Sequence, residues 1–392
     1  MKKICLLIFL IIFSFVIIEI ILRLAFLPPE MISVSENKYN LLKNKILNEN
    51  VKNKLEDGNL FIETPNGRRL RPITKVEIKN HYLSKKNIIF YINSLGFRHK
   101  EIETKKQNEK RILFLGDSIT FNDYLNDEET FIRLTENKIN NYLCSNNKIL
   151  KFEAINAGIG AIGLQNEYSI LIENGLKIKP DIVIIGFYLN DYEMSDGIKM
   201  IKVPYFLQKS WTIQYIYKII STIKYLLISK KNNPISLRNK KNIKTQIERE
   251  LENKYFENPN EFEKLIIKNY SDWGSAWSEN AWSVIEPMLL EIKRISCKND
   301  FKLIVLCFPV KYQVELKCAD NYPQNKLKVF CENNNINFID ILPDLKNISN
   351  KNQLFYDHCH LTPIGNKVVS DLIFNYLQKN NFFGRRLTRV FC

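Results

Sequence analysis

The sequence predicts an α/β fold in three layers, with a mostly parallel sheet between two layers of helices. Five short apolar runs follow residue 110, and stretches with the length and spacing of helices separate them. Strands that are apolar along their whole length are typical of a parallel sheet that is covered on both faces. Right-handed crossovers between them would then give a doubly wound sandwich.

The five expected strands are short and apolar, and they span residues 112–115, 152–155, 182–187, 303–308 and 336–339. The expected helices lie between and after them, at residues 128–143, 164–176, 281–297, 324–333 and 363–378. Residues 193–280 interrupt this alternation, and we expect a helical insertion there. We therefore predict one domain over residues 106–380 that carries the insertion.

A strongly apolar stretch at the amino terminus predicts a membrane anchor over residues 1–27. From Ile4 to Leu22 the only charged residue is Glu19, and at about 1.5 Å per residue such a helix nearly spans the hydrocarbon core of a bilayer. No small-residue cleavage pattern follows, which favours an anchor over a removed signal peptide. Because Lys2 and Lys3 precede the stretch, we expect the rest of the chain outside the cytoplasm.

Two other segments bear on how the chain meets the membrane. Residues 28–105 are polar and rich in Lys and Asn, and we expect a juxtamembrane segment with short strands. Residues 211–229 are apolar and aromatic at helical spacing, so they could lie in the membrane interface or pack as a lid over the ligand-binding face of the sheet. We favour the lid. Glu19 and Arg23 are four residues apart and can pair on one helix face.

The formal net charge of +15 first suggests a nucleic-acid-binding protein. The Lys residues are scattered along the chain rather than gathered in a stripe, so we expect no nucleic-acid partner. A diffuse positive field suits anionic lipid or an acidic glycan, and a general bias in composition would explain it as well. The eight cysteines form no CxxC pair, which argues against a zinc site, although Cys318 and Cys331 are spaced for a possible disulfide.

Four short polar stretches follow or flank the expected strands. They are Gly116-Asp117-Ser118, the glycine-rich residues 155–163, Asn190-Asp191, and Asp357 to His360 just before an expected helix. Singly, each has a structural explanation: Ser118 could cap a helix, and Asn190-Asp191 could form a turn. Together they predict a shared site, because the carboxyl ends of parallel strands meet at one edge of the sheet.

The residue types in these stretches suit nucleophilic catalysis. A serine hydroxyl needs a base to remove its proton, and His is the usual base near neutral pH. Asp357 lies three residues before His360, so its carboxylate can hold one ring nitrogen while the other faces Ser118. His81 and His99 lie in the irregular amino-terminal region, and His358 is adjacent to the aspartate and expected to point elsewhere.

Acyl transfer by such a serine also requires donors for the oxyanion. Three groups could supply them: the Ser118 backbone N–H, a backbone N–H near Gly160 or Ala161, and the Asn190 side-chain amide. Alanine can serve as a backbone donor if its φ angle is tolerated.

These motifs resemble the SGNH (GDSL) hydrolase superfamily, and specifically its membrane-anchored bacterial branch. Gly116-Asp117-Ser118 matches the first block, Asn190-Asp191 the third, and Asp357 to His360 the last, and the resemblance covers roughly residues 92–378. In the second block, Ala161 stands where the family usually has a glycine. The resemblance implies a flavodoxin-like sandwich and a serine esterase or acyltransferase without a metal or other cofactor. It also implies a bacterial periplasmic or cell-surface location.

The function we expect is an exported, membrane-tethered serine esterase that forms an acyl-enzyme on Ser118. We expect it to remove small acyl groups, above all O-acetyl groups, from envelope or extracellular glycans. Two alternatives stay open at this point. The same residues could pass the acyl group to a sugar hydroxyl instead of water, or the site could have decayed in a glycan-binding envelope protein.

Overall fold

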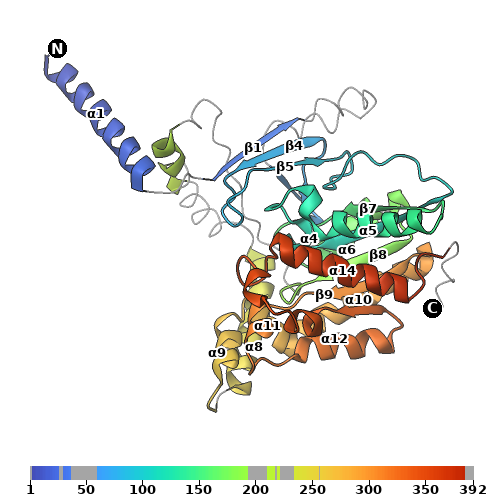
Figure 1. Cartoon of the computed structure of the whole chain (residues 1–392). Coiled ribbons are helices and arrows are strands. Elements are labelled where there is room, and N and C mark those ends of the chain that lie inside the picture. The colour runs from blue at the N-terminus through green and yellow to red at the C-terminus, as the bar shows by residue number, and fades with distance from the viewer. Residues whose placement is uncertain are drawn as a thin grey trace.

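A parallel sheet of five strands forms the centre of the protein (Figure 1). The computed structural model describes residues 2–25, 30–36, 60–192, 210–216, 219–220, 234–255 and 257–384. The strands are β6 (Glu109–Gly116), β7 (Lys151–Asn156), β8 (Ile182–Phe187), β9 (Lys302–Cys307) and β10 (Asn337–Asp340). Their order in space is β10-β9-β8-β6-β7, and every neighbouring pair is parallel.

Helices cover both faces of this sheet, as the apolar strands predict. Every residue of β8 is buried, and so is every residue of β6 after Glu109. On one face α5 (Phe131–Ser145) packs against α14 (Pro363–Lys379), and on the other α6 (Leu164–Glu173) packs against α10 (Glu279–Asn299). A further helix, α12 (Tyr322–Asn333), contacts β10. The three-layer α/β/α prediction is confirmed, with all five expected strands present.

The strand order contains a switch point between β6 and β8. The chain moves from β6 to β7 in one direction, and it then crosses back to β8 on the other side of β6. In doubly wound sheets of this order, ligands bind outside the carboxyl ends of the two strands at such a point. Ser118 follows β6 and Asn190 follows β8, so both motifs lie at the switch point.

The described part of the insertion is helical. It contains α8 (Pro234–Lys254), α9 (Glu261–Lys268) and the 3-10 helix η4 (Trp273–Trp277). Aromatic side chains join α9 to η4, with the ring centroids of Phe262 and Trp277 lying 5.3 Å apart. The remaining short elements are α4 (Ser118–Phe121), α11 (Lys311–Glu315), α13 (Leu342–Lys346), η1 (Asp127–Glu129), η2 (Gly175–Ile178) and η5 (Lys351–Gln353).

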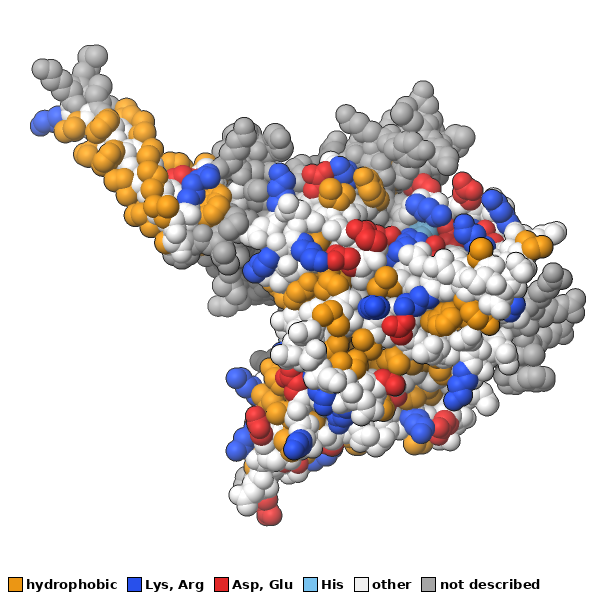
Figure 2. Space-filling view, viewed as in Figure 1, with side chains coloured by type: hydrophobic (Ala, Val, Ile, Leu, Met, Phe, Trp, Pro, Cys, Tyr) orange, Lys and Arg blue, Asp and Glu red, His pale blue; other side chains and the backbone are white. Residues whose placement is uncertain are grey.

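The amino-terminal helix α1 (Lys2–Ala25) projects from the rest of the molecule, and apolar side chains cover its visible face (Figures 1 and 2). Its residues Leu6–Ala25 are long and apolar enough to cross a membrane. The predicted pair within it is confirmed, because Arg23 Nε donates to Glu19 Oε1 over 2.8 Å.

The described residues between 30 and 105, which are 30–36 and 60–105, contribute two small antiparallel sheets. One has the order β1-β4-β5, from β1 (Met31–Glu36), β4 (Thr74–Lys79) and β5 (Ile88–Ile92), and the other pairs β2 (Phe61–Thr64) with β3 (Gly67–Leu70). The short strands expected here are therefore present.

Buried arginines tie this amino-terminal segment to the central domain. The backbone of Arg98 forms an isolated antiparallel β-bridge with that of Asn156, at the end of β7. The Arg68 side chain donates from Nη1 to the Gly160 carbonyl over 3.2 Å. The segment thus packs directly on the loops that follow β6 and β7.

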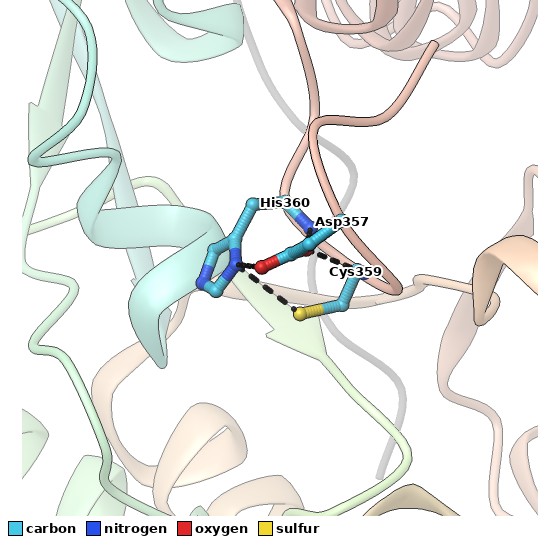
Figure 3. A group of neighbouring side chains, drawn as sticks. All are labelled: Asp357, Cys359 and His360. Carbon is cyan, nitrogen blue, oxygen red and sulfur yellow. Dashed lines mark hydrogen bonds and ion pairs between the residues drawn. The ribbon is translucent and has the colours of Figure 1, made fainter. Parts of the chain in front are cut away.

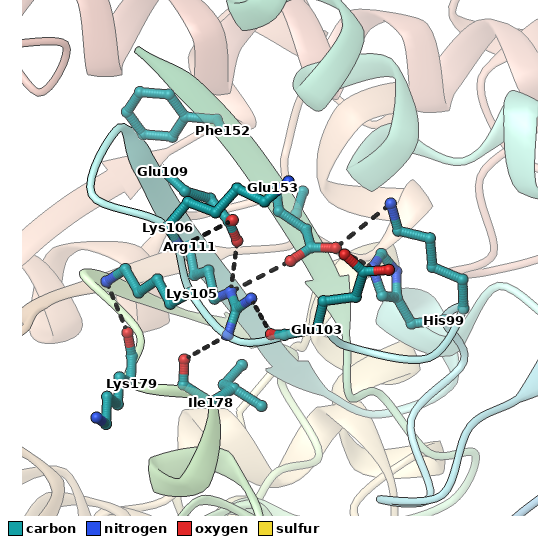
Figure 4. A network of polar contacts seen from close by, with 12 residues as sticks. His99, Glu103, Lys105, Lys106, Glu109, Arg111, Phe152, Glu153, Ile178 and Lys179 are labelled. Carbon is teal, nitrogen blue, oxygen red and sulfur yellow. Dashed lines mark hydrogen bonds and ion pairs between the residues drawn. The ribbon is translucent and has the colours of Figure 1, made fainter. Parts of the chain in front are cut away.

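A network of ion pairs closes the amino-terminal edge of the sheet (Figure 4). The buried Arg111 side chain contacts the carboxylates of Glu109 and Glu153 at 2.7 and 3.2 Å, and it donates to the Ile178 and Glu103 carbonyls. Polar groups at this edge are engaged with one another, whereas the motif residues lie at the opposite edge.

Cys318 and Cys331 do not form the disulfide that their spacing allowed, because both cysteines are free thiols. Cys331 is buried among apolar side chains, and burial raises the pKa of its thiol to about 12. It therefore behaves as a small core residue.

Candidate active site

The structure brings Ser118, His360 and Asp357 into one hydrogen-bonded chain. His360 Nε2 lies 2.9 Å from Ser118 Oγ, and His360 Nδ1 lies 2.7 Å from Asp357 Oδ2. Ser118 begins α4 directly after β6, and the other two residues lie in the loop before α14. The two halves of this chain are 242 residues apart in sequence. This is the arrangement that proton transfer from serine to histidine requires.

A sharp turn between β6 and α4 presents Ser118 at the helix amino terminus. Gly116 has φ +155°, and a Cβ added there would lie 2.1 Å from Thr120 Oγ1. Asp117 caps the helix, since its carboxylate accepts a hydrogen bond of 2.8 Å from the Ile119 N–H. The alternative that Ser118 is the helix cap is therefore wrong, and its hydroxyl is left for His360.

Asp357 orients the imidazole through both of its carboxylate oxygens. Its Oδ1 accepts from the backbone N–H groups of Cys359 and His360, at 2.9 and 2.8 Å, which fixes the carboxylate. Its Oδ2 then accepts from His360 Nδ1 (Figure 3). Because the carboxylate requires a proton on Nδ1, the neutral ring has its lone pair on Nε2, the atom that faces Ser118.

The same pair sets the protonation of the two side chains. Burial opposes the charged imidazolium, but the hydrogen bond and the negative charge of Asp357 outweigh burial and raise the pKa of His360 above its usual value. Burial likewise opposes the Asp357 carboxylate, and its hydrogen bonds with His360 and Cys359 instead hold the pKa of Asp357 far below its usual value. Asp357 is therefore ionised wherever His360 titrates.

Tyr124 packs edge-on against the His360 ring, with 5.2 Å between the ring centroids. It is fully buried and lies on the turn that follows α4. Its ring limits how the imidazole can rotate between Ser118 and Asp357. Nothing in the local sequence marks Tyr124 as part of the site, because its role depends on a contact with a loop far along the chain.

Asn190 stands at the carboxyl end of β8, next to the strand that presents Ser118. Its Nδ2 donates to Asp272 Oδ1 over 3.0 Å, and Asp272 Oδ2 lies 3.4 Å from His358 Nε2. An amide nitrogen carries two hydrogens, so one remains for an oxyanion. The sequence did not indicate Asp272, which the insertion supplies, and His358 points to Asp272 rather than into the hydrogen-bonded chain.

The glycine-rich loop after β7 lies directly on α4. A Cβ at Gly158 would be 2.5 Å from the Phe121 nitrogen, and Asn156 Nδ2 donates to the Thr120 carbonyl over 3.0 Å. Ala161, farther along this loop, is exposed and has φ +57°, in the left-handed region that favours glycine. The loop is thus next to the nucleophile, and a donor at Gly160 or Ala161 stays a prediction.

Buried carboxyl groups lie behind the site. Asp117, Glu167 and Asp191 are at least 98% buried, and burial raises the pKa of each, to about 6 for Asp117. Asp191 fixes the turn after β8, because its Oδ2 accepts from the Tyr188 N–H over 3.0 Å. Asp191 thus positions the backbone that carries Asn190.

Among the described residues, one group could hold a metal ion: Asp357, Cys359 and His360, whose ligand atoms lie within 4.8 Å of one another (Figure 3). Cys359 Sγ is 3.5 Å from His360 Nδ1, the atom that Asp357 already engages. A metal at this place would have to displace the hydrogen bond that orients the imidazole.

No protein-family model and no curated protein matches the chain. Solved structures similar to it include an acetyl xylan esterase, with 16% identity over 68% of this chain and 99% of that chain, at a TM-score of 0.37. Others are a lipase/acylhydrolase from Enterococcus faecalis (14%, 69% and 96%, TM-score 0.37) and a GDSL-like lipase from Bacteroides thetaiotaomicron (13%, 71% and 93%, TM-score 0.35). The chain is thus similar to solved esterases and acylhydrolases, one of them of the GDSL type.

Proposed function

We propose that this protein is a serine esterase that hydrolyses acyl esters through an acyl-enzyme on Ser118. One observation carries the proposal: the hydrogen bonds from Ser118 Oγ to His360 Nε2 and from His360 Nδ1 to Asp357. A hydroxyl, a base and an orienting carboxylate at these distances are what acyl transfer needs.

In the first half of the reaction, His360 Nε2 accepts the Ser118 proton while Oγ attacks the ester carbonyl carbon. The negative charge that develops on the carbonyl oxygen is met by the Ser118 backbone N–H and the free amide hydrogen of Asn190. Asp357 stabilises the imidazolium that forms. When the carbon–oxygen bond to the leaving group breaks, His360 returns the proton to that oxygen and an alcohol departs.

Water completes the second half of the reaction. His360, again neutral, accepts a proton from a water molecule while the oxygen of that water attacks the acyl carbon. The bond to Ser118 Oγ then breaks, His360 gives the proton back to Oγ, and a carboxylic acid is released. No cofactor enters this scheme.

The substrates we propose are small acyl esters, above all O-acetyl groups on envelope or extracellular glycans. The polar side chains of His358 and Asp272 are 35% and 40% exposed next to Asn190, and a rim of this kind suits a hydroxyl-rich substrate. The apolar helix α1 supports tethering to a membrane, with the domain on its outer side.

The test is turnover of p-nitrophenyl acetate by the full chain. Ser118→Ala should abolish turnover and labelling by a fluorophosphonate probe, because no hydroxyl remains to be acylated. Ser169→Ala is the matched control, since Ser169 is half-buried on α6 and donates to the Gln165 carbonyl of its own helix. Full turnover by Ser118→Ala would overturn the proposal.

Acetate release from an acetylated glycan tests the proposed substrate and the choice between hydrolysis and acyl transfer. We expect free acetate in the presence and absence of an added glycan acceptor. If far more acetyl is transferred to the acceptor than is released as acetate, the protein is an acyltransferase rather than an esterase. A wild-type chain that fails to react with the fluorophosphonate probe would indicate a decayed site.

A further inference from the structure

A short helical segment of the insertion docks on the carboxyl-terminal end of α1. The described residues of this segment are 210–216 and 219–220, and Figure 1 shows its helix beside the end of α1. Glu19, in the last two turns of α1, is the residue that receives it. The two parts of the chain are more than 190 residues apart in sequence.

The Glu19 carboxylate caps the first turn of this segment. Its Oε1 accepts from the Trp211 N–H at 3.0 Å, and its Oε2 accepts from the Thr212 N–H and the Ser210 hydroxyl, both at 2.9 Å. The Thr212 hydroxyl donates to Oε2 as well, at 2.8 Å. A carboxylate in a membrane helix is costly unless it is neutralised or hydrogen-bonded, and here every contact is supplied by the insertion or by Arg23.

Arg23 and Trp211 add a contact of a kind typical of membrane boundaries. The Arg23 guanidinium lies over the Trp211 ring, 5.3 Å from its centroid, and remains 48% exposed. Tryptophan is enriched where a transmembrane helix leaves the hydrocarbon core, and an arginine near a helix end extends its charged group to the same level. The contact therefore places the start of the segment at the level where α1 ends.

The first turn of the segment is buried, whereas its later residues are apolar and exposed. Thr212 and Gln214 are 5% and 6% exposed, whereas Ile216, Ile219 and Ile220 are 47%, 58% and 46% exposed. A helix that packs as a lid over the catalytic face would bury its apolar residues. Here the apolar residues face outward, next to a helix whose own apolar side chains are also exposed.

We propose that residues 210–216 and 219–220 belong to an interfacial membrane element, held by Glu19 at the boundary between lipid headgroups and acyl chains. The proposal rests on α1 being retained as the anchor. For residues 211–229 the sequence favoured a lid and left a membrane contact open; residues 217–218 and 221–229 lie outside the described residues, and for the described part we propose the membrane contact. The occupant of the exposed isoleucine face is the bilayer into which α1 inserts, because the two apolar surfaces adjoin at Glu19 and Arg23.

Tryptophan quenching in vesicles tests this placement with the full chain. Of the four tryptophans, Trp273, Trp277 and Trp282 are at most 1% exposed inside the domain, so Trp211 supplies the quenchable signal. Lipids brominated near the headgroup should quench it more than lipids brominated near the chain ends. Trp211→Phe should remove the quenching, and Glu19→Ala should lose most of it, because the segment is no longer held on α1.

Ile219→Asp should weaken the quenching of Trp211 while leaving turnover of p-nitrophenyl acetate unchanged. Ile149→Asp is the matched control, since Ile149 is an isoleucine on the domain surface that is 75% exposed. An unquenched Trp211 in a chain that floats with vesicles would overturn this proposal alone. A chain that does not float would overturn the anchor as well.

Discussion

At the scale of single residues, the protonation of His360 decides when the site can react by the mechanism we propose. The Asp357 contact raises the pKa of His360, so the ring stays charged to a higher pH than an ordinary histidine, whose pKa is about 6.5. A charged ring cannot accept the Ser118 proton. We therefore expect kcat/KM for p-nitrophenyl acetate to fall as the pH is lowered through a midpoint above about 6.5.

The variant Asp357→Asn separates this cause from others. It removes the charge that raises the pKa of His360, so the midpoint should move to lower pH, and kcat should fall by roughly 10²–10⁴-fold because the imidazole loses its orientation. A pH–rate profile of the variant and of the wild type measures both effects. An unshifted midpoint in Asp357→Asn would show that another group titrates.

Asp272 is a positioning residue, because it touches the Asn190 amide rather than the reacting atoms. Asp272→Ala should lower kcat with little change in KM, by less than the roughly 10²–10³-fold loss expected for removing an oxyanion donor outright. Asn190→Ala supplies that upper limit. His358→Ala, which removes the second contact of Asp272, should leave kcat near the wild-type value, and a loss as large as that of Asp272→Ala would place the effect at His358 instead.

At the scale of elements, Arg98 holds the turn that follows α4. Its buried guanidinium donates to the carbonyls of Phe121, Asn122 and Leu125, at 2.9, 2.6 and 2.7 Å. Arg98→Met removes charge-assisted hydrogen bonds from all three carbonyls, of which Phe121 and Asn122 keep one other donor each, so we expect the free energy of unfolding to fall by about 2–4 kcal/mol. Denaturant unfolding measures this loss.

The control for Arg98 is Arg294→Met on α10. Arg294 is 64% exposed and pairs only with Glu291 one turn away, so its replacement should cost no more than about 0.5 kcal/mol. Equal effects of the two substitutions would contradict the assigned role of Arg98. Tyr124 lies on the turn that Arg98 holds and packs against His360, so Arg98→Met should also lower the turnover of p-nitrophenyl acetate.

Local pattern predicted the elements well, and it missed contacts that depend on distant parts of the chain. The apolar run 182–187 predicts a strand that is buried on both faces. The structure has β8 at those same bounds, with every residue buried. The contact between Asp357 and His360 was predictable because His360 follows Asp357 by three positions, so the two side chains can meet within one loop. Arg98, Tyr124 and Asp272 carry no such local signature, since each reaches the site only through the tertiary fold.

At the scale of the whole molecule, the two edges of the sheet have different tasks. The amino-terminal edge is closed by the Arg111 network, in which the carboxylates and the guanidinium satisfy one another (Figure 4). The carboxyl-terminal edge carries Ser118 and Asn190, and loops and buried arginines of the amino-terminal segment cover it. The site is therefore built from the central domain and from residues 60–105 together.

This construction predicts where the chain can be shortened. A chain that begins at residue 28 lacks α1 but keeps β1, Arg68, Arg98 and the strands that pack over the loops, so it should keep the wild-type kcat/KM for p-nitrophenyl acetate. A chain that begins at residue 106 loses both arginines and exposes the apolar residues of the central domain beneath β4 and β5. We expect it to be inactive and to unfold without a cooperative transition.

Circular dichroism during thermal unfolding, together with turnover of p-nitrophenyl acetate, distinguishes the two chains. The chain from residue 28 is the matched control for the one from residue 106, because both lack the membrane helix. If the chain from residue 106 folded cooperatively and retained turnover, the amino-terminal segment would be a separate unit, and the predicted domain boundary at residues 105 and 106 would hold. Loss of both properties would instead make residues 60–105 part of the catalytic domain, since the buried guanidinium of Arg98 donates charge-assisted hydrogen bonds to three carbonyls of the turn that follows α4.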